Sequence, residues 1–367
     1  MRPPRLIFSG GGTGGHLYPA LAVAEEIRRR VANAEISFVG TQKKIEARIV
    51  PEHGFPLETI WISGFQRTVS VETLLFPIKI LVSMIQSLLL LRKHSPDVVI
   101  GTGGYVCGPV VYAAQLKGIP TLIQEQNSYP GVTTRLLAHR AQEVHLAFEG
   151  SRRFLKRQDN IHISGNPTRE GLGALKHEEG CRILGLDPSL PIVLVFGGSQ
   201  GASSMNKVMT DLAPALDHAG IQIVWQTGRS EFGKIKERIG SLAPHAKVMD
   251  FIERMDAAYA ACDLAVCRSG ATTIAELTCA GVPSVLIPYP FAAADHQTEN
   301  AKELVAAGAA VLVPDGKMRG ELSGVIRTLL DNPARRRQMA EAARSLARPT
   351  ATGVLADAVL NLAVRRQ

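Results

Sequence analysis

The 367-residue sequence lacks features that mark several classes of protein. It contains no Asp-x-Asp pair, which is the usual carboxylate clamp for a metal ion on a diphosphate. Its five cysteines show no CxxC spacing, so we expect reduced core thiols rather than a zinc site or a disulfide. The first residues lack the basic start, apolar stretch and small-residue cleavage site of a signal peptide, so we expect a protein that stays inside the cell.

Positive charge is concentrated in the first half of the chain. The formal net charge is +8, and residues 1–165 hold 19 Lys and Arg against 12 Asp and Glu, whereas residues 166–367 hold 22 against 21. A basic half can face nucleic acid, an anionic membrane or a phosphorylated substrate, and charge alone does not choose among them. An ordinary basic, soluble surface is the alternative.

Short β-rich segments alternate with helix-forming sequence along the whole chain, which is the pattern of βαβ winding with parallel strands. The pattern restarts, because one β-rich segment leads into the glycines at 10–15 and another leads into those at 197–201. We therefore predict an α/β fold of two doubly wound, Rossmann-like domains, residues 1–165 and 166–349, that face a central ligand cleft. The predicted strands are Leu6–Ser9, Ile36–Gly40, Asp97–Ile100, Thr121–Ile123, Ile192–Phe196, Ile221–Trp225, Leu264–Val266 and Ser284–Ile287.

One segment departs from this pattern. Residues Leu74–Leu91 are almost entirely apolar, and Arg92 and Lys93 follow directly. Most of the polar interruptions recur at helical spacing on one stripe, which leaves a broad apolar face; they are Lys79, Ser83, Gln86 and Ser87. We interpret the segment as a helix lying in a membrane interface, with a helix buried in its own domain as the alternative. The polar stripe disfavours a helix that spans the membrane.

Glycine clusters follow three of the predicted strands. The first, Gly10–Gly15, matches the GxGxxG pattern of dinucleotide-binding folds, but the next strand ends at Thr41 without the acidic residue that binds ribose in such proteins. A nicotinamide enzyme is therefore disfavoured. Because glycine leaves backbone N–H groups open at a helix N-terminus, each cluster can bind a phosphate group or form a plain tight turn. The other clusters are Gly101–Gly104 with Tyr105, and Gly197–Gly201.

Two titratable residues lie where such loops enter helices. At His16 the helix N-terminus disfavours an imidazolium, so we expect a neutral ring that can accept a proton; the alternative is a polar residue bonded to its own loop. Glu276 could bind two ribose hydroxyls or be an ordinary charged helix residue. Without a metal clamp, the charge of a leaving group must be met by helix dipoles, loop amides and arginines such as Arg169 and Arg268.

Seven short motifs occur in one order, and as a set they resemble a single family. They are Gly11-Gly-Thr-Gly-Gly-His16, Gly103-Gly-Tyr105, Glu125-Gln-Asn127, Gly165-Asn-Pro167, Gly197-Gly-Ser-Gln-Gly-Ala202, Arg268-Ser-Gly-Ala271 and Asp295-His-Gln297. The whole chain is similar to the undecaprenyl-diphospho-muramoylpentapeptide β-N-acetylglucosaminyltransferases, the MurG family. Cys107 and Thr134 depart from it, because they stand where a smaller residue and an asparagine are expected.

This resemblance implies the GT-B architecture. Residues 1–165 would bind the acceptor and the membrane, residues 166–349 would bind the UDP-sugar, and a C-terminal helix within 350–367 would pack back on the first domain. By resemblance, the main chain of Ile252 reads uracil, Ser199 lies at the diphosphate and Gln297 faces the sugar hydroxyls. The residues implied at UDP-N-acetylglucosamine are Thr13, Gly14, Gly15, Asn127, Arg169, Ser199, Ile252, Ala271, Thr272, Thr273, Ile274, Ala275, Glu276 and Gln297, and those at the acceptor diphosphate are Gly103, Gly104 and Tyr105.

The implied reaction is an inverting transfer without a cofactor or a bound metal. The C4 hydroxyl of an undecaprenyl-diphosphate-linked muramoyl-pentapeptide attacks the anomeric carbon of UDP-N-acetylglucosamine, with His16 as the candidate base. The resemblance places this step of peptidoglycan synthesis peripherally at the cytoplasmic face of a bacterial inner membrane, against an anionic lipid surface and not nucleic acid. It also implies roles in cell shape and division and a place in a cell-wall or division complex. Two alternatives stay open: a UDP-N-acetylglucosamine epimerase, which needs no lipid acceptor, and a nucleotide-sugar sensor without turnover.

Overall fold

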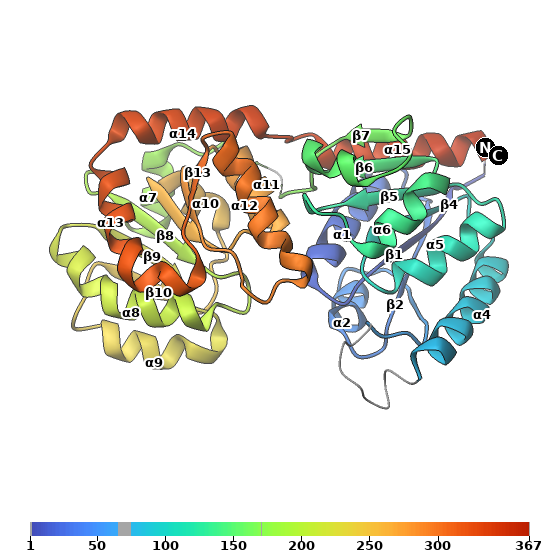
Figure 1. The fold of residues 1–367 in the computed structure, drawn as a ribbon, viewed down its shortest axis with the longest axis horizontal. Helices are drawn as coiled ribbons and strands as arrows, with labels where there is room; N and C mark the ends of the chain where they lie inside the picture. The colour runs from blue at the N-terminus through green and yellow to red at the C-terminus, as the bar shows by residue number, and fades with distance from the viewer. Residues whose placement is uncertain (1, 65–74, 170, 367) are drawn as a thin grey trace. The chain divides into compact units, whose positions relative to one another are not determined.

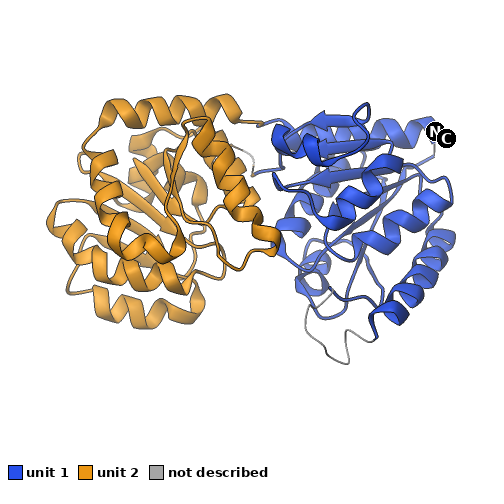
Figure 2. Cartoon of the chain, viewed as in Figure 1, with its two compact units in different colours: residues 1–168, 349–367 blue, residues 169–348 orange. Residues whose placement is uncertain are grey.

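The chain folds into two compact units, shown in Figure 2. The structure, a computed structural model, describes residues 2–64, 75–169 and 171–366. Unit 1 consists of Met1–Thr168 with Pro349–Gln367, and unit 2 consists of Arg169–Arg348. The first domain is therefore built from two separate stretches of the sequence.

Unit 1 is built on a seven-stranded, fully parallel sheet in the order β3-β2-β1-β4-β5-β6-β7 (Figure 1). The strands are β1 (Arg5–Gly10), β2 (Glu35–Gly40), β3 (Leu57–Thr59), β4 (Val98–Gly103), β5 (Thr121–Glu125), β6 (Glu143–Leu146) and β7 (Ile161–Ile163). The helices are α1 (Gly14–Arg30), α2 (Ile45–Glu52), α4 (Phe76–His94), α5 (Cys107–Leu116), α6 (Val132–Leu137) and α15 (Ala351–Arg366), with short 3-10 turns at Ala138–Arg140 and Glu149–Phe154.

Helices cover both faces of this sheet, as the apolar residues of its strands require. Successive side chains of a strand point to opposite faces, so Leu6 and Phe8 of β1 pack with α1 and α15, while Ile7 packs on the other side with α5. Leu355 and Val359 of α15 are fully buried in the first of these clusters. The C-terminal helix is thus part of the core of unit 1.

Unit 2 repeats the plan with a six-stranded parallel sheet in the order β10-β9-β8-β11-β12-β13. Its strands are β8 (Ile192–Phe196), β9 (Gln222–Gln226), β10 (Ala246–Met249), β11 (Leu264–Cys267), β12 (Ser284–Leu286) and β13 (Ala310–Leu312). Its helices are α7 (His177–Leu184), α8 (Ser203–His218), α9 (Arg229–Ile239), α10 (Met255–Ala261), α11 (Ala271–Ala280), α12 (His296–Ala306), α13 (Met318–Leu330) and α14 (Pro333–Leu346), with 3-10 turns at Ala293–Asp295 and Asp315–Lys317.

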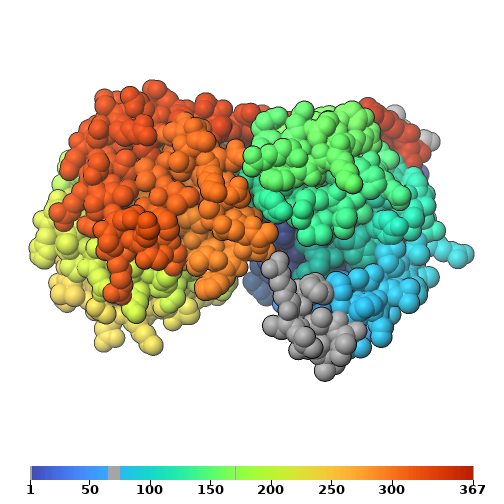
Figure 3. All heavy atoms as spheres, in the orientation of Figure 1, coloured from blue at the N-terminus to red at the C-terminus, as the bar shows by residue number. Residues whose placement is uncertain are grey.

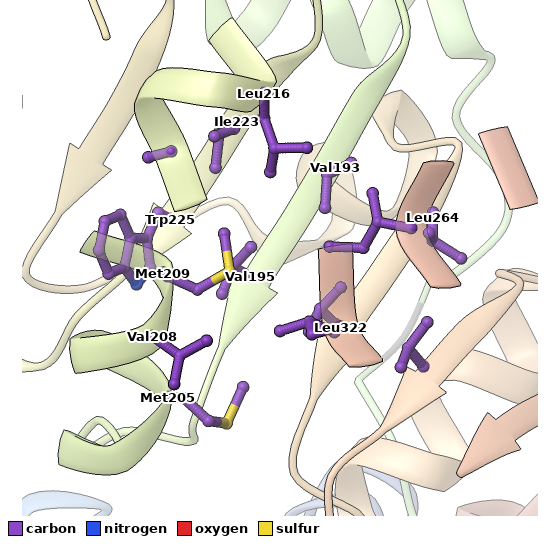
Figure 4. Close-up of a cluster of buried hydrophobic side chains, with 14 of the residues drawn as sticks. Val193, Val195, Met205, Val208, Met209, Leu216, Ile223, Trp225, Leu264 and Leu322 are labelled. Carbon is purple, nitrogen blue, oxygen red and sulfur yellow. The ribbon is translucent and has the colours of Figure 1, made fainter. Parts of the chain in front are cut away.

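The core of unit 2 lies between its sheet and helices α8 and α13. Figure 4 shows Val193 and Val195 of β8 in the same buried cluster as Met209, Trp225 and Leu322. The indole of Trp225 is fully buried, and its N–H donates to the side chain of Asn206, so no polar atom of the ring is left unsatisfied.

The predicted fold class, two doubly wound parallel sheets, is confirmed. All eight predicted strands are present, with small differences at their ends. The sequence did not predict β3, β6, β10 and β13, which have three or four residues each. Such short segments carry little apolar signal, and β6 includes the polar residues Glu143 and His145.

Helix α4 presents its apolar side outward. Ile78, Ile80, Leu81, Ile85 and Leu89 are between 43% and 63% exposed. The helix lies at the surface of unit 1, in light blue in Figure 3. The predicted apolar face is therefore present, and the alternative of a helix buried in its own domain is wrong for these five residues. The first residue of the predicted segment, Leu74, lies outside the described residues.

The polar stripe of α4 faces inward instead. Ser83 and Ser87 are fully buried and donate to carbonyls of their own helix, while Lys79 is 8% exposed and donates to the Ser63 hydroxyl at 3.0 Å. Small hydroxyls and one paired lysine thus share the side of α4 that packs on α5 with Leu91, which is buried in the same core. Across the described parts of the chain, we found no helix both long and apolar enough to cross a membrane.

Candidate functional site

In unit 1 the first two glycine clusters meet at the carboxyl edge of the sheet. Strands β1 and β4 are neighbours, and Gly10 pairs with Gly103 in their register. A Cβ on Gly104 would lie 2.4 Å from the carbonyl oxygen of Gly11, and one on Gly103 would lie 2.7 Å from His16 Nδ1. Both glycines have left-handed φ angles, +100° for Gly103 and +80° for Gly104, so no other residue fits at either position. The structure therefore brings the predicted acceptor loop against the start of α1.

Part of the first glycine loop already holds an anionic group, the side chain of Glu46 from α2. This carboxylate is fully buried and accepts hydrogen bonds from Gly12 N at 3.0 Å and from Thr41 N and Oγ1 at 3.1 and 2.7 Å. A phosphate group at Gly12 would compete with this carboxylate. The prediction of a phosphate-binding loop is therefore wrong for Gly12, whereas Thr13 and Gly15 at the start of α1 are exposed.

His16 is half-buried at the first turn of α1. Its Nδ1 lies 2.8 Å from Oε1 of Gln126, and its backbone carbonyl accepts from the Thr102 hydroxyl at 2.8 Å. Two neighbouring strand ends, those of β4 and β5, therefore hold the histidine. Gln126 was not singled out from the sequence, because its only signal was its place between Glu125 and Asn127.

Glu125 organises the loop that carries Asn127. Its buried carboxylate accepts from Asn127 N at 3.1 Å, from Gly131 N at 3.0 Å and from the Thr134 hydroxyl at 2.6 Å. Ser151 donates to the Asn127 carbonyl at 2.9 Å. Thr134, where the resemblance leads us to expect an asparagine, thus supports this loop with a hydroxyl donor.

Tyr105 follows the second glycine loop and packs on the first one. A Cβ on Gly12 would lie 3.0 Å from its ring. Burial raises the pKa of the Tyr105 hydroxyl, so this group is a neutral hydrogen-bonding side chain at neutral pH. Thr13 and Gly15, which follow Gly12 in the chain, are exposed.

In unit 2 the corresponding edge is formed by the ends of β8, β9 and β11. Phe196 pairs with Gln226 and with Cys267, so the loops that follow these three strands begin side by side. The loop after β8 packs closely on the loop after β9: a Cβ on Gly201, whose φ is +78°, would lie 2.0 Å from the Thr227 carbonyl oxygen. Ser199 is exposed in this loop, as a ligand-binding residue must be.

Glu276 lies on α11 and is only 5% exposed. Its Oε2 accepts from the Tyr259 hydroxyl at 3.0 Å, and its Oε1 lies 3.0 Å from Arg169 Nε. Burial raises the pKa of Glu276, and the Arg169 guanidinium opposes that shift. Burial also raises the pKa of Tyr259 well above its usual range. Two residues expected at the nucleotide sugar, Glu276 and Arg169, are thus paired in this structure.

The backbone of Ile252 is coupled to the loop after β8 by one side chain. Gln226, the last residue of β9, accepts from Ile252 N at 2.8 Å through Oε1 and donates to the Gly198 carbonyl at 2.9 Å through Nε2. The Ile252 N–H is therefore already bonded within the domain. The sequence did not reveal Gln226, because a single glutamine at a strand end has no pattern.

Arg268 is an internal structural residue. It is 6% exposed, pairs with Asp315 at 2.6 Å, and donates to the carbonyls of Ile287 and Pro288 and to the Ser204 hydroxyl. The prediction that Arg268 is available to meet the charge of a leaving group is therefore wrong. Arg169, whose side chain is 49% exposed, is accessible.

The remaining predicted residues of unit 2 lie at the start of α11 and α12. Ala271–Ala275 form the first turns of α11, whose first N–H groups have no partner inside the helix. Gln297, on α12, accepts from Tyr289 N at 2.9 Å, and its carbonyl accepts from the Ser269 hydroxyl at 2.8 Å. Within residues 2–64, 75–169 and 171–366, no group of three or more His, Cys, Asp or Glu could hold a metal ion.

Comparison with known proteins gives a consistent result over nearly the whole chain. Residues 6–146 match the glycosyltransferase family 28 N-terminal domain, and residues 192–352 match the glycosyltransferase family 28 C-terminal domain. The chain is 47% identical over 363 residues to a UDP-N-acetylglucosamine--N-acetylmuramyl-(pentapeptide) pyrophosphoryl-undecaprenol N-acetylglucosamine transferase of Chlorobaculum tepidum, covering 98% of this chain and 99% of the relative. A protein of the same name from Salinibacter ruber is 43% identical over 365 residues, covering 99% and 98%. The crystal structure of Acinetobacter baumannii MurG matches with a TM-score of 0.79 at 31% identity, covering 98% of this chain and 100% of that one.

Proposed function

Because this chain belongs to glycosyltransferase family 28, and within it to the MurG-type N-acetylglucosamine transferases, we infer that it transfers N-acetylglucosamine from UDP to undecaprenyl-diphosphate-linked muramoyl-pentapeptide. It is a hexosyltransferase of peptidoglycan synthesis that converts lipid I to lipid II. The observation that carries this conclusion is the 47% identity, which extends over 98% of the chain and so covers both units.

We propose that unit 2 binds UDP-N-acetylglucosamine at the ends of β8, β9 and β11. Ser199 is exposed and can donate to the diphosphate, and the open N–H groups at the start of α11 favour the same negative charge. The Ile252 carbonyl can accept from the N3–H of uracil, because its own N–H is bonded to Gln226. Glu276 can bind the ribose hydroxyls with the oxygen that here faces Arg169. The side chain of Gln297 can bind the hydroxyls of the sugar.

We propose that unit 1 binds the acceptor at the Gly103–Tyr105 loop and supplies the base, with Thr13–Gly15 and Asn127 near the transferred sugar. In an inverting displacement, the C4 oxygen of the muramoyl residue forms a bond to the anomeric carbon while the bond from that carbon to the phosphate oxygen breaks. The hydroxyl proton goes to His16, and UDP leaves with the electron pair. Loop amides and helix termini then meet the charge on the departing diphosphate.

The outward apolar face of α4 supports a peripheral position on an anionic membrane. Five large apolar side chains are exposed on this helix. Its last turn carries the exposed Arg92, which can reach lipid phosphates, and Lys93, which pairs with Glu58 at 2.7 Å. The lipid-linked acceptor lies in that surface, so adsorption concentrates enzyme and substrate in one plane. We also propose that the chain acts at the cytoplasmic face of the inner membrane. Because its product serves peptidoglycan synthesis, we propose that it contributes to cell shape and division and belongs to a cell-wall complex.

Turnover tests the activity directly. Purified chain is given UDP-N-acetylglucosamine with and without a lipid-diphosphate-linked muramoyl-pentapeptide, with chelator throughout, and UDP and disaccharide lipid are measured. We expect disaccharide only when the acceptor is present. Consumption of the nucleotide sugar without acceptor would instead indicate an epimerase or a hydrolase, and binding without turnover by folded protein would indicate a sensor.

Vesicle binding tests the membrane proposal separately. Each of Leu81 and Leu89 is more than half exposed, so changing both to asparagine should remove about 2 kcal/mol or more of burial in lipid. We expect binding to vesicles of phosphatidylglycerol and phosphatidylcholine to weaken at least about 30-fold. Leu242→Asn, at a leucine 49% exposed on unit 2, is the matched control. Equal binding by the double variant and the control would remove α4 as the membrane contact.

A further inference from the structure

A row of hydrogen bonds between buried amide side chains connects His16 to the segment where the chain leaves unit 1. Nδ1 of His16 is bonded to Oε1 of Gln126, and Nε2 of Gln126 donates to Oε1 of Gln124. Nε2 of Gln124 then donates to Oδ1 of Asn166 at 3.2 Å. The three amide residues are each 3% exposed or less. Water therefore does not compete for these bonds, and their geometry is set by the protein.

The orientation of the Gln126 amide follows from its neighbours. Its Nε2 donates to the Thr102 carbonyl at 2.7 Å and to the Gln124 carbonyl at 3.2 Å, in addition to the Gln124 side chain. Rotating the amide by 180° would point its oxygen at three other oxygens and remove the donor that it supplies to them. Oε1 of Gln126 must therefore be the atom that faces His16.

This orientation decides which nitrogen of His16 carries the proton. Oε1 of Gln126 can only accept a hydrogen bond, so Nδ1 must be the donor in the pair. In the neutral ring the lone pair then lies on Nε2, and Nε2 is the atom that can take a proton. The opposite tautomer would place two lone pairs against each other at 2.8 Å.

We propose that Gln126 is a positioning residue that holds His16 in the Nδ1–H form, with Gln124 and Asn166 supporting it from behind. The proposal rests on His16 being the base of the proposed function. Along the row each group donates to the next, so the bonds polarise one another in one direction. When Nε2 takes the proton of the acceptor hydroxyl, the ring becomes positively charged, and the Gln126 carbonyl dipole aimed at Nδ1–H stabilises that charge. A neutral amide thus fills the orienting role that a carboxylate has in Ser-His-Asp sites.

The far end of the row lies in the connecting segment. Asn166 follows Gly165, whose φ is +87°, and unit 1 ends at Thr168. Nδ2 of Asn166 is buried and has no partner among the described residues, so the amide is held there through its oxygen alone. The same row of three hydrogen bonds therefore links this segment to His16.

Side-chain NMR of the full-length protein tests the tautomer without relying on activity. In the histidine-labelled chain, the signals of His16 are identified by their loss in His16→Gln, and we expect Nε2 to be the unprotonated nitrogen. In Gln126→Met, which keeps the length of the side chain and removes its polar atoms, we expect loss of the single tautomer.

Measurements of kcat and KM test the consequence for catalysis. We expect kcat of Gln126→Met to fall about 10- to 100-fold with the KM of both substrates unchanged, a part of the 10²- to 10⁴-fold that general bases contribute. Gln124→Met should lower kcat less, because Gln126 keeps its bond to Thr102. Gln115→Met is the matched control, since Gln115 is another amide of unit 1 whose partners are Thr121 and the Leu137 carbonyl.

The outcomes separate this inference from the proposed function. An Nε2–H ring in the wild-type chain, or an unchanged tautomer and kcat in Gln126→Met, would overturn the role of Gln126. A Gln126-dependent Nδ1–H ring in a chain that transfers no sugar would support the positioning role while the proposed function fails. An equal loss of melting temperature and kcat in Gln126→Met and Gln115→Met would assign the effect to folding and also overturn it.

Discussion

Replacing Glu276 with glutamine should weaken the binding of UDP much more than it changes the fold. Glutamine has the same shape and keeps an acceptor for the Tyr259 hydroxyl, which is the buried partner of Glu276. What it removes is the negative charge that we propose binds the ribose hydroxyls. Hydrogen bonds to charged groups contribute about 1.5–3 kcal/mol, so the Kd for UDP should rise about 10- to 150-fold. Loss of the ion pair with Arg169 should lower the free energy of unfolding by at most about 1 kcal/mol, because that arginine is half exposed.

Titration calorimetry with UDP and with 2′-deoxy-UDP measures this effect and its cause. If Glu276 contacts the ribose, the wild-type chain should discriminate between the two nucleotides, and Glu276→Gln should lose most of that discrimination. Glu26→Gln is the matched control, because Glu26 is also a buried glutamate paired with arginines, but on α1 in unit 1. An unchanged Kd in Glu276→Gln would refute the ribose contact. An equal loss of affinity for both nucleotides would leave Glu276 only as the anchor of Arg169.

Three further outcomes follow from buried groups. Arg268→Met leaves the Asp315 carboxylate beside it without its cation, so the free energy of unfolding should fall by about 3 kcal/mol or more in urea titrations; a smaller loss would contradict the structural role. Burial raises the pKa of Glu276, so the protonated form stabilises the fold; this contribution is complete below about pH 4.5 and is lost as pH rises through the folded-state pKa. Without nucleotide, the free energy of unfolding should therefore fall less between pH 5 and pH 8 in Glu276→Gln than in the wild type. Burial raises the pKa of the Cys107 thiol to about 12, so at pH 8 a thiol reagent should label the half-buried Cys279 before Cys107. Equal labelling of Cys107 and Cys279 in the native chain, measured by mass spectrometry, would contradict this.

The parts of the fold that could be predicted from the sequence are those with local signals. An apolar segment followed by glycines and a helix specifies a parallel strand and its loop, as at β1 and β8, and parallel strands collect such loops at one edge. This is why the structure brings His16 and Gly103, far apart in the chain, next to each other. Several short strands escaped prediction, because three or four residues such as those of β3 carry no period that can be counted.

The parts that could not be predicted depend on partners from other elements. Gln126 and Gln226 are single amides whose roles come from groups on separate loops, His16 in one unit and Ile252 in the other. Arg268 stands in a motif loop like a ligand-binding arginine, but its partner Asp315 lies outside that loop and draws it inward. The sequence showed that α4 has an apolar face, whereas only its packing on α5 shows that this face is turned outward.

The return of α15 to unit 1 sets the order in which the protein can be completed. Synthesis produces residues 1–168 first, but the face of α1 and β1 that Leu355, Val359 and Leu362 cover stays open until all of unit 2 has been made. During translation the first unit is therefore an unfinished core that exposes apolar surface, and the second unit is the first that can close. The same topology makes residues 1–168 a poor fragment for expression, whereas residues 169–348 form a continuous piece of chain.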